Sequence, residues 1–194
     1  MHAGTGEVRE HPLPQGVVDT TRALAANNGW VYEEYSAQDY VVAEDSELAS
    51  GHAKLLGMPM QARPLDELDG KVVRVQFIVD IADRDQVLET AVPGAEMSHA
   101  TSPAQPGAAY ISYVPVGITK ATAIDEIAGI LGTTIDNVMM VGDGHNDMEP
   151  MAATGFGAAM GNAVDEVKAL ASHVVADVEH DGLVEALALS AELG

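Results

Sequence analysis

The sequence contains no cysteine, which excludes disulfide bonds and thiol chemistry. Basic residues are also scarce, because 9 Lys and Arg stand against 30 Asp and Glu and give a net charge of −21. Nucleic acids and anionic membranes bind basic surfaces, so both are disfavoured as partners. The chain has no apolar run of membrane-spanning length, and its start lacks a basic-then-apolar signal pattern. A cytoplasmic protein is therefore expected.

Aromatic residues make up only 4% of the chain, although 47% of its residues are hydrophobic. We therefore expect a core of Ala, Val, Leu, Ile and Met. A length of 194 residues accommodates one domain or two small ones. The acidity is interpreted as a solubility feature.

One stretch near the C-terminal end joins a hydrophobic run to a polar turn. Residues 138–147 read Val-Met-Met-Val-Gly-Asp-Gly-His-Asn-Asp. The apolar part has no polar alternation and predicts a buried parallel strand. The glycines allow a sharp turn at its carboxyl end, where open α/β sheets bind ligands. An Asp-Gly pair alone would indicate only a turn, but the two carboxylates and the amide together are hard oxygen ligands of the kind that Mg²⁺ takes alongside a phosphate.

This combination of a buried strand, a Gly-Asp-Gly turn, an Asn-Asp pair and a following helix resembles the fourth motif of the haloacid dehalogenase superfamily of phosphatases. It is most similar to the Cof-type branch, which carries a large α/β cap. The resemblance implies an enzyme that hydrolyses phosphomonoesters with Mg²⁺ as its cofactor. It also implies that Asp143 binds the metal, that Asp147 holds the metal directly or through its waters, and that Asn146 orients the phosphate or the nucleophile. Gly144 then lies in the vicinity of the phosphate.

Two more residues extend the resemblance, which covers residues 118–189. Lys120 is expected in the first turn of a helix with Thr119 as its N-cap, where a cation opposes the helix dipole. It resembles the lysine of the family's third motif, which neutralises the nucleophile and the phosphate. Asn162 lies where the family often has a residue that lines the site. A turn asparagine after Gly161 is an equally good interpretation of Asn162.

We expect an α/β protein with three segments. Residues 1–14 are a lead-in from the core, residues 15–115 an α+β cap that sets the substrate, and residues 116–194 the C-terminal part of a Rossmann-like hydrolase core. The order of elements in the cap indicates helices that cover one face of a mainly antiparallel sheet. Residues 101–107 are predicted to form a loop. In the last segment strands alternate with helices, which indicates a parallel sheet.

A second apolar run, residues 72–79, is followed by Asp80, Asp83 and Asp85. The family needs Asp-x-Asp directly after a buried strand, followed by Gly and usually Thr. None of these aspartates is followed by the glycine turn. We interpret them as helix-start and surface charges.

The family's Asp-x-Asp-Gly-Thr motif, and its second motif with Ser or Thr after a strand, are absent from the sequence. The chain is therefore expected to be a fragment with little phosphatase activity by itself, because the aspartate nucleophile is missing. The strand that ends at Val141 would lack a neighbour, and its unpaired edge predicts a homo-oligomer or aggregation. The substrate implied by the resemblance is a small phosphorylated metabolite, such as a sugar phosphate.

Two alternatives stay open. A non-catalytic remnant of the same fold would act as a binding or regulatory protein. The missing nucleophile favours this reading, and retention of the site residues opposes it. An unrelated α/β binding protein with a chance Gly-Asp-Gly turn is the other alternative.

Overall fold

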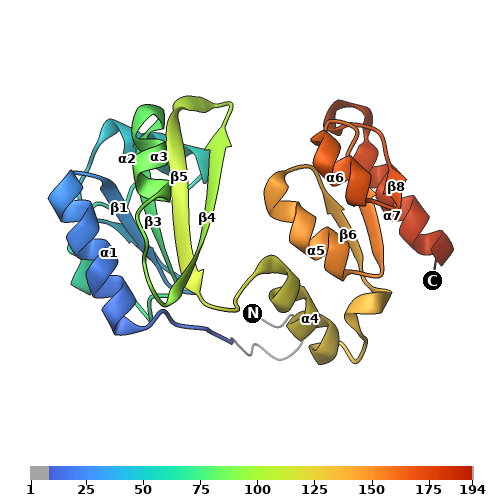
Figure 1. The fold of residues 1–194 in the computed structure, drawn as a ribbon, viewed down its shortest axis with the longest axis horizontal. Helices are drawn as coiled ribbons and strands as arrows, with labels where there is room; N and C mark the ends of the chain where they lie inside the picture. Colours follow the sequence, from blue (N-terminus) through green and yellow to red (C-terminus); the bar gives the residue numbers. More distant parts are fainter. Residues whose placement is uncertain (1–8, 194) are drawn as a thin grey trace. The chain divides into compact units, whose positions relative to one another are not determined.

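The computed structural model describes residues 9–193, and the chain divides into two compact units (Figure 1). The first unit ends at Ile118 and the second begins at Thr119. The first eight residues of the predicted lead-in, residues 1–14, lie outside the described residues. Further along the lead-in, the Leu13 amide donates to the Val72 carbonyl at 2.8 Å, and the buried Leu13 side chain belongs to the core of the first unit.

An antiparallel sheet of five strands, in the order β2-β1-β3-β5-β4, forms the centre of the first unit. The strands are β1 (Val31–Tyr35), β2 (Tyr40–Val42), β3 (Arg74–Asp80), β4 (Ala95–Ser102) and β5 (Gln105–Pro115). The helices are α1 (Gln15–Asn28), α2 (Glu47–Leu55) and α3 (Arg84–Leu88). The prediction of a mainly antiparallel sheet is confirmed.

The loop predicted for residues 101–107 is wrong. β4 continues to Ser102 and β5 begins at Gln105, so the two strands form a hairpin with an irregularity between Thr101 and Ser102. The segment contains Pro103, Pro106 and Gly107, residue types that are depleted in strands. Pairing along the rest of β4 and β5 extends both strands through it, which is a case of sheet context overriding local propensity.

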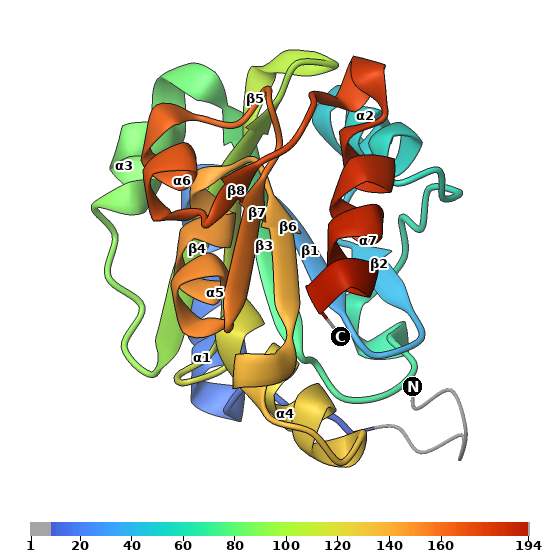
Figure 2. The same cartoon turned by 90° about the vertical axis from the view of Figure 1, so that its right-hand side faces the viewer.

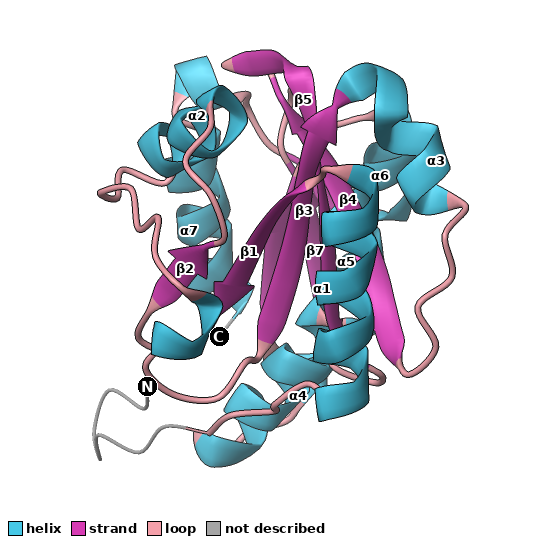
Figure 3. Cartoon of the chain, turned by 90° about the vertical axis from the view of Figure 1, so that its left-hand side faces the viewer, coloured by secondary structure: helices cyan, strands magenta, loops and turns pink. Residues whose placement is uncertain are grey.

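Helices cover both faces of this sheet, and the prediction of one covered face is also wrong. Successive residues of a strand point to opposite faces. Phe77 of β3 packs in the cluster that contains Val18 of α1 and Val87 of α3. Its neighbour Ile78 packs in a different cluster, against Leu48 of α2. Figure 3 shows α2 on one side of the sheet and α1 and α3 on the other.

The first unit buries two carboxylates side by side in β1, and each is paired. Glu33 faces α2, where its carboxylate lies 3.0 Å from His52 Nδ1 and accepts hydrogen bonds from the Tyr35 hydroxyl at 2.5 Å and the Gln76 amide at 3.1 Å. Glu34 faces α1 and accepts two hydrogen bonds from the Arg22 guanidinium, at 2.6 and 2.7 Å. Buried charges need such partners, because the protein interior does not replace their hydration.

A parallel sheet of three strands, in the order β6-β7-β8, forms the second unit (Figure 2). The strands are β6 (Met139–Gly142), β7 (Phe156–Ala159) and β8 (His173–Val174). The helices are α4 (Lys120–Ile130), α5 (Met148–Ala153), α6 (Asp165–Leu170) and α7 (Gly182–Leu193). The predicted parallel sheet is confirmed, and with it the α/β fold class.

Helices again lie on both faces of this sheet. Met151 of α5 and Val167 of α6 pack with Ala159 on one face. Ala186 of α7 packs with Ala158 and Val175 on the other. β6 is an edge strand, because no other described strand pairs with its second side. Across residues 9–193, no helix has both the length and the hydrophobicity needed to cross a membrane.

Candidate active site

The Gly-Asp-Gly turn follows directly from β6, and its glycines make room for other side chains of the same loop. A Cβ atom on Gly142 would lie 2.5 Å from the Asp147 Cβ atom, and one on Gly144 would lie 2.7 Å from the Asn146 Oδ1 atom. Both distances are shorter than van der Waals contact allows. The small residues therefore let Asp147 fold back beneath the turn at the carboxyl end of the strand.

Asp147 accepts hydrogen bonds from two amides of the turn and from Lys120. It is only 7% exposed, and its Oδ2 atom accepts hydrogen bonds from the amides of Asp143, at 3.1 Å, and Gly144, at 3.2 Å. Its Oδ1 atom accepts a 2.7 Å hydrogen bond from the Lys120 ammonium. Burial acts to raise the pKa of Asp147, but the hydrogen bonds from Lys120 and the two amides outweigh it and hold the pKa below the ordinary value of 3.8. The group is therefore an anion at neutral pH.

Lys120 is the first residue of α4, as the sequence predicts. The Thr119 hydroxyl caps this helix by accepting a 3.3 Å hydrogen bond from the Thr122 amide, and the Thr119 amide donates to the Thr122 hydroxyl. The predicted N-cap is thus confirmed. The Lys120 side chain is 51% exposed. Its ammonium can therefore hold Asp147 and still meet an anion from solvent.

Asp143 and Asn162 meet above the sheet, one after β6 and the other after β7. The Asn162 amide donates to Asp143 Oδ2 at 3.0 Å, and the Asp143 carbonyl accepts a 3.1 Å hydrogen bond from the Val164 amide. Both Asp143 and Asn162 are exposed. The structure brings Asn162 into contact with the Gly-Asp-Gly loop, which goes beyond the contacts of a simple turn residue.

Asn146 is exposed, and its side chain makes no hydrogen bond with other residues of the described chain. An uncommitted amide at this position is available to a ligand. His145 beside it is exposed as well. The site therefore presents a carboxylate, an amide and a half-exposed ammonium to solvent at the carboxyl end of a parallel sheet.

These groups fit Mg²⁺ in part. Mg²⁺ keeps several waters and is commonly held by one or two carboxylates together with substrate phosphate oxygens. Asp143 supplies one exposed carboxylate, and Asp147 lies in the same turn with its oxygens bonded to Lys120 and two amides. Residues 9–193 contain no group of three or more His, Cys, Asp or Glu side chains that could hold a metal ion. The donor set suits an ion that completes its shell with water and phosphate.

Sequence reasoning missed two contacts of this site. The Glu149 carboxylate of α5 accepts a 2.9 Å hydrogen bond from the Thr119 hydroxyl and so ties α5 to the start of α4. The Val178 amide, after β8, donates to the Asn162 side chain at 3.0 Å. Glu149 has the position of an ordinary helix-start acid, and a backbone amide leaves no signal in a sequence, so neither contact was predictable from spacing.

The aspartates after β3 belong to the first unit and serve its local structure. Asp80 caps the short turn that follows β3, because its carboxylate accepts a 2.9 Å hydrogen bond from the Ala82 amide. Asp85 pairs with Arg84 at the surface. Their interpretation as helix-start and surface charges is confirmed.

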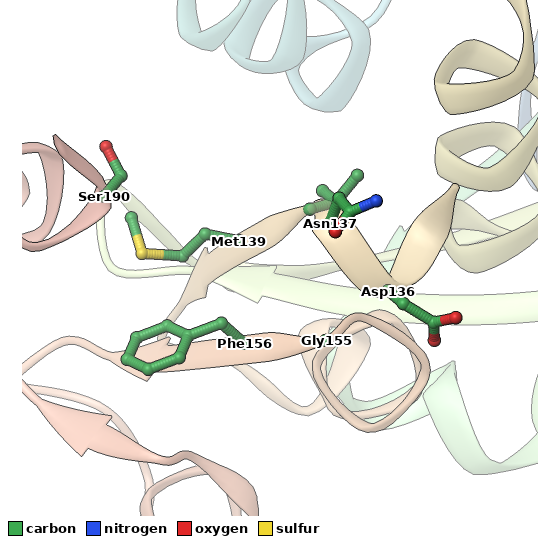
Figure 4. Close-up of a pocket in the computed structure, with 7 residues that line it drawn as sticks. Asp136, Asn137, Met139, Gly155, Phe156 and Ser190 are labelled. Atoms are coloured by element: carbon green, nitrogen blue, oxygen red, sulfur yellow. The ribbon is translucent and has the colours of Figure 1, made fainter. Parts of the chain in front are cut away.

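A cleft of about 350 Å³ opens at the opposite end of the second sheet (Figure 4). Met139 and Phe156, at the amino ends of β6 and β7, line it together with Ser190 of α7. It shares no residue with the polar groups at the carboxyl ends of the strands. The candidate site is therefore an open polar surface of the second unit and is separate from this cleft.

Comparisons with known proteins identify the family of the chain. Residues 7–187 match the family described as haloacid dehalogenase-like hydrolase. A phosphoglycolate phosphatase from Natronomonas pharaonis is 34% identical over 186 residues, which are 92% of this chain and 79% of the relative. The 5-amino-6-(5-phospho-D-ribitylamino)uracil phosphatase YcsE from Bacillus subtilis is 34% identical over 116 residues, which are 58% of this chain and 45% of the relative.

A solved structure shares the fold. It is that of the sugar phosphatase BT4131, of haloacid dehalogenase subclass IIB, with a TM-score of 0.74 and 24% sequence identity. The similarity covers 91% of this chain and 66% of the solved chain. The chain thus spans less than half the length of YcsE and about two thirds of the solved phosphatase.

Proposed function

Because the chain belongs to the haloacid dehalogenase-like hydrolases, in their Cof-type branch, we propose that it is a Mg²⁺-dependent phosphatase of small phosphomonoesters. The observation that carries this proposal is the 2.7 Å ion pair between Lys120 and Asp147 at the carboxyl end of a parallel sheet. A lysine held at that distance by a buried aspartate has a fixed position. Such a cation suits an anionic substrate better than a mobile surface lysine does.

Each site residue has a role that follows from its surroundings. Asp143 would hold Mg²⁺ through an exposed oxygen, and Asp147, which orients Lys120, would hold the metal directly or through its waters. Lys120 directs its ammonium at the phosphate and at the nucleophile, and the uncommitted Asn146 amide donates to a phosphate oxygen. Gly144 would lie in the vicinity of that phosphate. When bound, Mg²⁺ supplies the positive charge that phosphoryl transfer needs at the reacting group.

The proposed organisation gives the two units different tasks. Residues 116–194 contribute the metal and lysine site of the hydrolase core, and residues 15–115 form a cap that sets the substrate. The relatives differ in the substrates that they are named for, since one is a phosphoglycolate phosphatase and another acts on a phosphorylated ribitylaminouracil. We therefore expect a small phosphorylated metabolite. Phosphoglycolate and sugar phosphates are the first substrates to test.

The 194 residues contain no Asp-x-Asp-Gly-Thr, so we propose that this chain alone hydrolyses phosphomonoesters very slowly. A covalent route through an aspartyl phosphate needs that carboxylate. The same absence supports the second candidate, a non-catalytic protein of this fold that binds Mg²⁺ and a phosphorylated ligand. A cytoplasmic location and self-association through the open edge of β6 remain predictions.

Binding and turnover can be measured on the same samples. The chain is titrated with MgCl₂ and then with inorganic phosphate, while NMR follows the amides of Asp143 and Gly144. Hydrolysis of an aryl phosphate is recorded in parallel. We expect both amides to respond and hydrolysis to stay at background. Lys120→Met should weaken phosphate binding about tenfold or more, because a charge-assisted contact is lost, and Asp143→Asn should weaken the response to Mg²⁺.

The outcomes separate the candidates. Amides that respond to neither ion would overturn both the phosphatase and the binding protein. Binding without turnover supports the metal and phosphate site and a chain that is inactive alone. Hydrolysis that disappears in Asp143→Asn would establish an active phosphatase and overturn the expected inactivity. A nucleophile would then have to be sought among the aspartates of the chain.

A further inference from the structure

Asn162 connects the loops that follow all three strands of the second sheet. Its Nδ2 atom donates to Asp143 Oδ2 at 3.0 Å, and its Oδ1 atom accepts a hydrogen bond from the Val178 amide at 3.0 Å. Asp143 follows β6, Asn162 follows β7 and Val178 follows β8. One side chain therefore joins three segments that are far apart in the sequence.

The contact with Val178 determines which end of the Asn162 amide faces Asp143. A backbone N–H only donates, so the oxygen of the amide must point to Val178. The NH₂ group then points to Asp143, where it can donate to a carboxylate. The orientation of the side chain follows from its two partners and does not depend on distinguishing nitrogen from oxygen.

This arrangement makes the two oxygens of Asp143 unequal. Oδ2 accepts the hydrogen bond from Asn162, whereas Oδ1 accepts none from the residues that the structure describes. The backbone of Asp143 is also fixed, because its amide donates to Asp147 and its carbonyl accepts from Val164. Asp143 thus offers one free oxygen from a fixed position.

We propose that Asn162 is a positioning residue that makes Asp143 a one-oxygen ligand and so favours Mg²⁺ over Ca²⁺ at this site. The inference rests on the proposed function, which assigns Asp143 to the metal. Mg²⁺ requires near-octahedral geometry and takes single oxygens, while Ca²⁺ takes six to eight ligands and often both oxygens of one carboxylate. A hydrogen bond that occupies Oδ2 opposes the two-oxygen mode, and therefore disfavours the larger ion.

The test compares affinities for the two ions in the full 194-residue chain. Wild type, Asn162→Ala and Asn162→Asp are each titrated with MgCl₂ and with CaCl₂, and NMR follows the Gly144 amide. Loss of a residue that hydrogen-bonds to a metal ligand and orients it typically lowers the affinity for the metal about 10–100-fold. We expect the ratio of Mg²⁺ affinity to Ca²⁺ affinity to fall about tenfold in both variants.

Both variants lose the side-chain N–H donor of Asn162, but they differ in charge and in the acceptor that they offer to the Val178 amide. An effect that both variants share can therefore be assigned to the lost donor. Asn162→Ala removes both hydrogen bonds and should weaken Mg²⁺ binding. Asn162→Asp keeps an oxygen for the Val178 amide, so the loop after β8 stays attached, and it adds a charge that should strengthen binding of both ions. A common fall in the ratio, with absolute affinities that move in opposite directions, would point to the lost donor. Asn162→Asp also serves if Asn162→Ala folds poorly.

Asn137→Ala is the matched control, because Asn137 is another exposed asparagine of the same unit. Among the described residues, its side-chain amide donates only to the Thr134 hydroxyl, at 3.3 Å. Its ratio should equal that of the wild type. An unchanged ratio in both Asn162 variants would overturn the inference and leave Asn162 with a structural role, even if both affinities fell. A wild-type chain that binds Mg²⁺ no better than Asp143→Asn would overturn the proposed metal site as well. The two failures are therefore distinguishable.

Discussion

The two phenylalanines of the chain show how differently its two units are built. Phe77, in the central strand of the first sheet, is fully buried and lies within 6 Å of the rings of Trp30, Tyr32 and Tyr113. Phe156 begins β7 of the second sheet, is only partly buried, and lines a cleft. It is also the only aromatic residue of Phe, Tyr or Trp type after Ile118 in the sequence.

The comparison teaches where each unit obtains its stability. The first unit has a large aromatic and aliphatic core and five paired strands, and it buries carboxylates only with complete sets of partners. The second unit has two small clusters rich in alanine and a sheet of three short strands. Among the residues of this unit that the structure describes, Asp147 is the one buried carboxylate, and it is directed to a half-exposed lysine. The unit with the weaker core thus holds the candidate chemistry.

The largest expected effect comes from truncating each phenylalanine to alanine. Phe77→Ala should lower the free energy of unfolding of the first unit by about 3–5 kcal/mol, because it leaves a cavity among packed rings. Phe156→Ala should lower that of the second unit by about 1–2 kcal/mol, since a partly buried ring loses less area. Urea unfolding followed by Trp30 fluorescence measures the first unit, and amide hydrogen exchange in β7 measures the second. Equal losses in both units would contradict the comparison.

A smaller effect is expected from the buried carboxylate of the second unit. The pKa of Asp147 is lowered in the folded state, so its ionised form favours folding. Its contribution is complete above the ordinary pKa of 3.8 and is lost as the pH falls through the lowered value. Asp147→Asn should lower the stability of the second unit by about 1–2 kcal/mol at neutral pH, within the range for hydrogen bonds to charged groups.

Hydrogen exchange of β6 amides, followed from about pH 5 down through the lowered pKa of Asp147, measures this effect, with Asp136→Asn as the control. Asp136 is exposed, and no hydrogen bond of its side chain to the described residues is present. The loss of stability of the second unit at acid pH should be absent in Asp147→Asn and retained in Asp136→Asn. The same acid dependence in both variants would show that Asp147 is not its source.

Helix caps give a matched pair, one in each unit. The Ser46 hydroxyl accepts from the Ala49 amide at 3.1 Å at the start of α2, and Thr119 caps α4. Ser46→Ala and Thr119→Ala should each cost about 1 kcal/mol in the stability of their own unit. Only Thr119→Ala should also weaken phosphate binding, because Lys120 follows it directly. Phosphate titration of both variants checks this. If Thr119→Ala and Ser46→Ala bind phosphate with equal affinity, the Thr119 cap does not help to position Lys120.

The last prediction concerns association of the chain through the edges of its sheets. β4, at one edge of the first sheet, is mostly exposed and polar, whereas β6 at the edge of the second sheet is apolar. We predict that the chain self-associates through β6, more strongly at 1 M than at 0.1 M NaCl, because salt screens its net charge of −21. Sedimentation velocity measures this association.

Lysine substitutions test which edge is responsible. Met139→Lys in β6 should reduce association, because a charge on an edge strand opposes pairing with another strand. Met97→Lys in β4, where Met97 is already exposed, should leave association unchanged. A chain that sediments as a monomer at every concentration and salt level would show that β6 does not mediate self-association.

Much of the local structure was predictable from the sequence. The apolar run that ends in the Gly-Asp-Gly turn predicts β6, and the apolar run 72–79 coincides with β3 (Arg74–Asp80), whereas the hairpin between β4 and β5 is not predicted. Thr119 is predicted as an N-cap because its hydroxyl precedes a helical pattern. The site residues were predictable as a group, because the Gly-Asp-Gly turn after an apolar strand brings Asp143 and Asp147 together through short-range geometry alone.

Contacts between distant segments were not predictable. The position of α2 on the opposite face from α1 depends on Leu48 meeting Ile78, and nothing in the helical pattern selects one face of the sheet. Glu33 and Glu34 are adjacent acids that would be read as exposed, yet both are buried because His52 and Arg22 reach them from different helices. Pairing partners of this kind are set by packing.

By itself, then, the sequence determined the α/β class, the elements and the chemical composition of the candidate site, since these follow from interactions between residues a few positions apart. The tertiary structure alone decided that Lys120 Nζ reaches Asp147 across 27 residues of sequence, and that Asn162 holds Asp143 on one side and the Val178 amide on the other. The reason is physical. Each of these hydrogen bonds joins segments that meet only after the three strands have aligned in parallel and placed their carboxyl ends side by side.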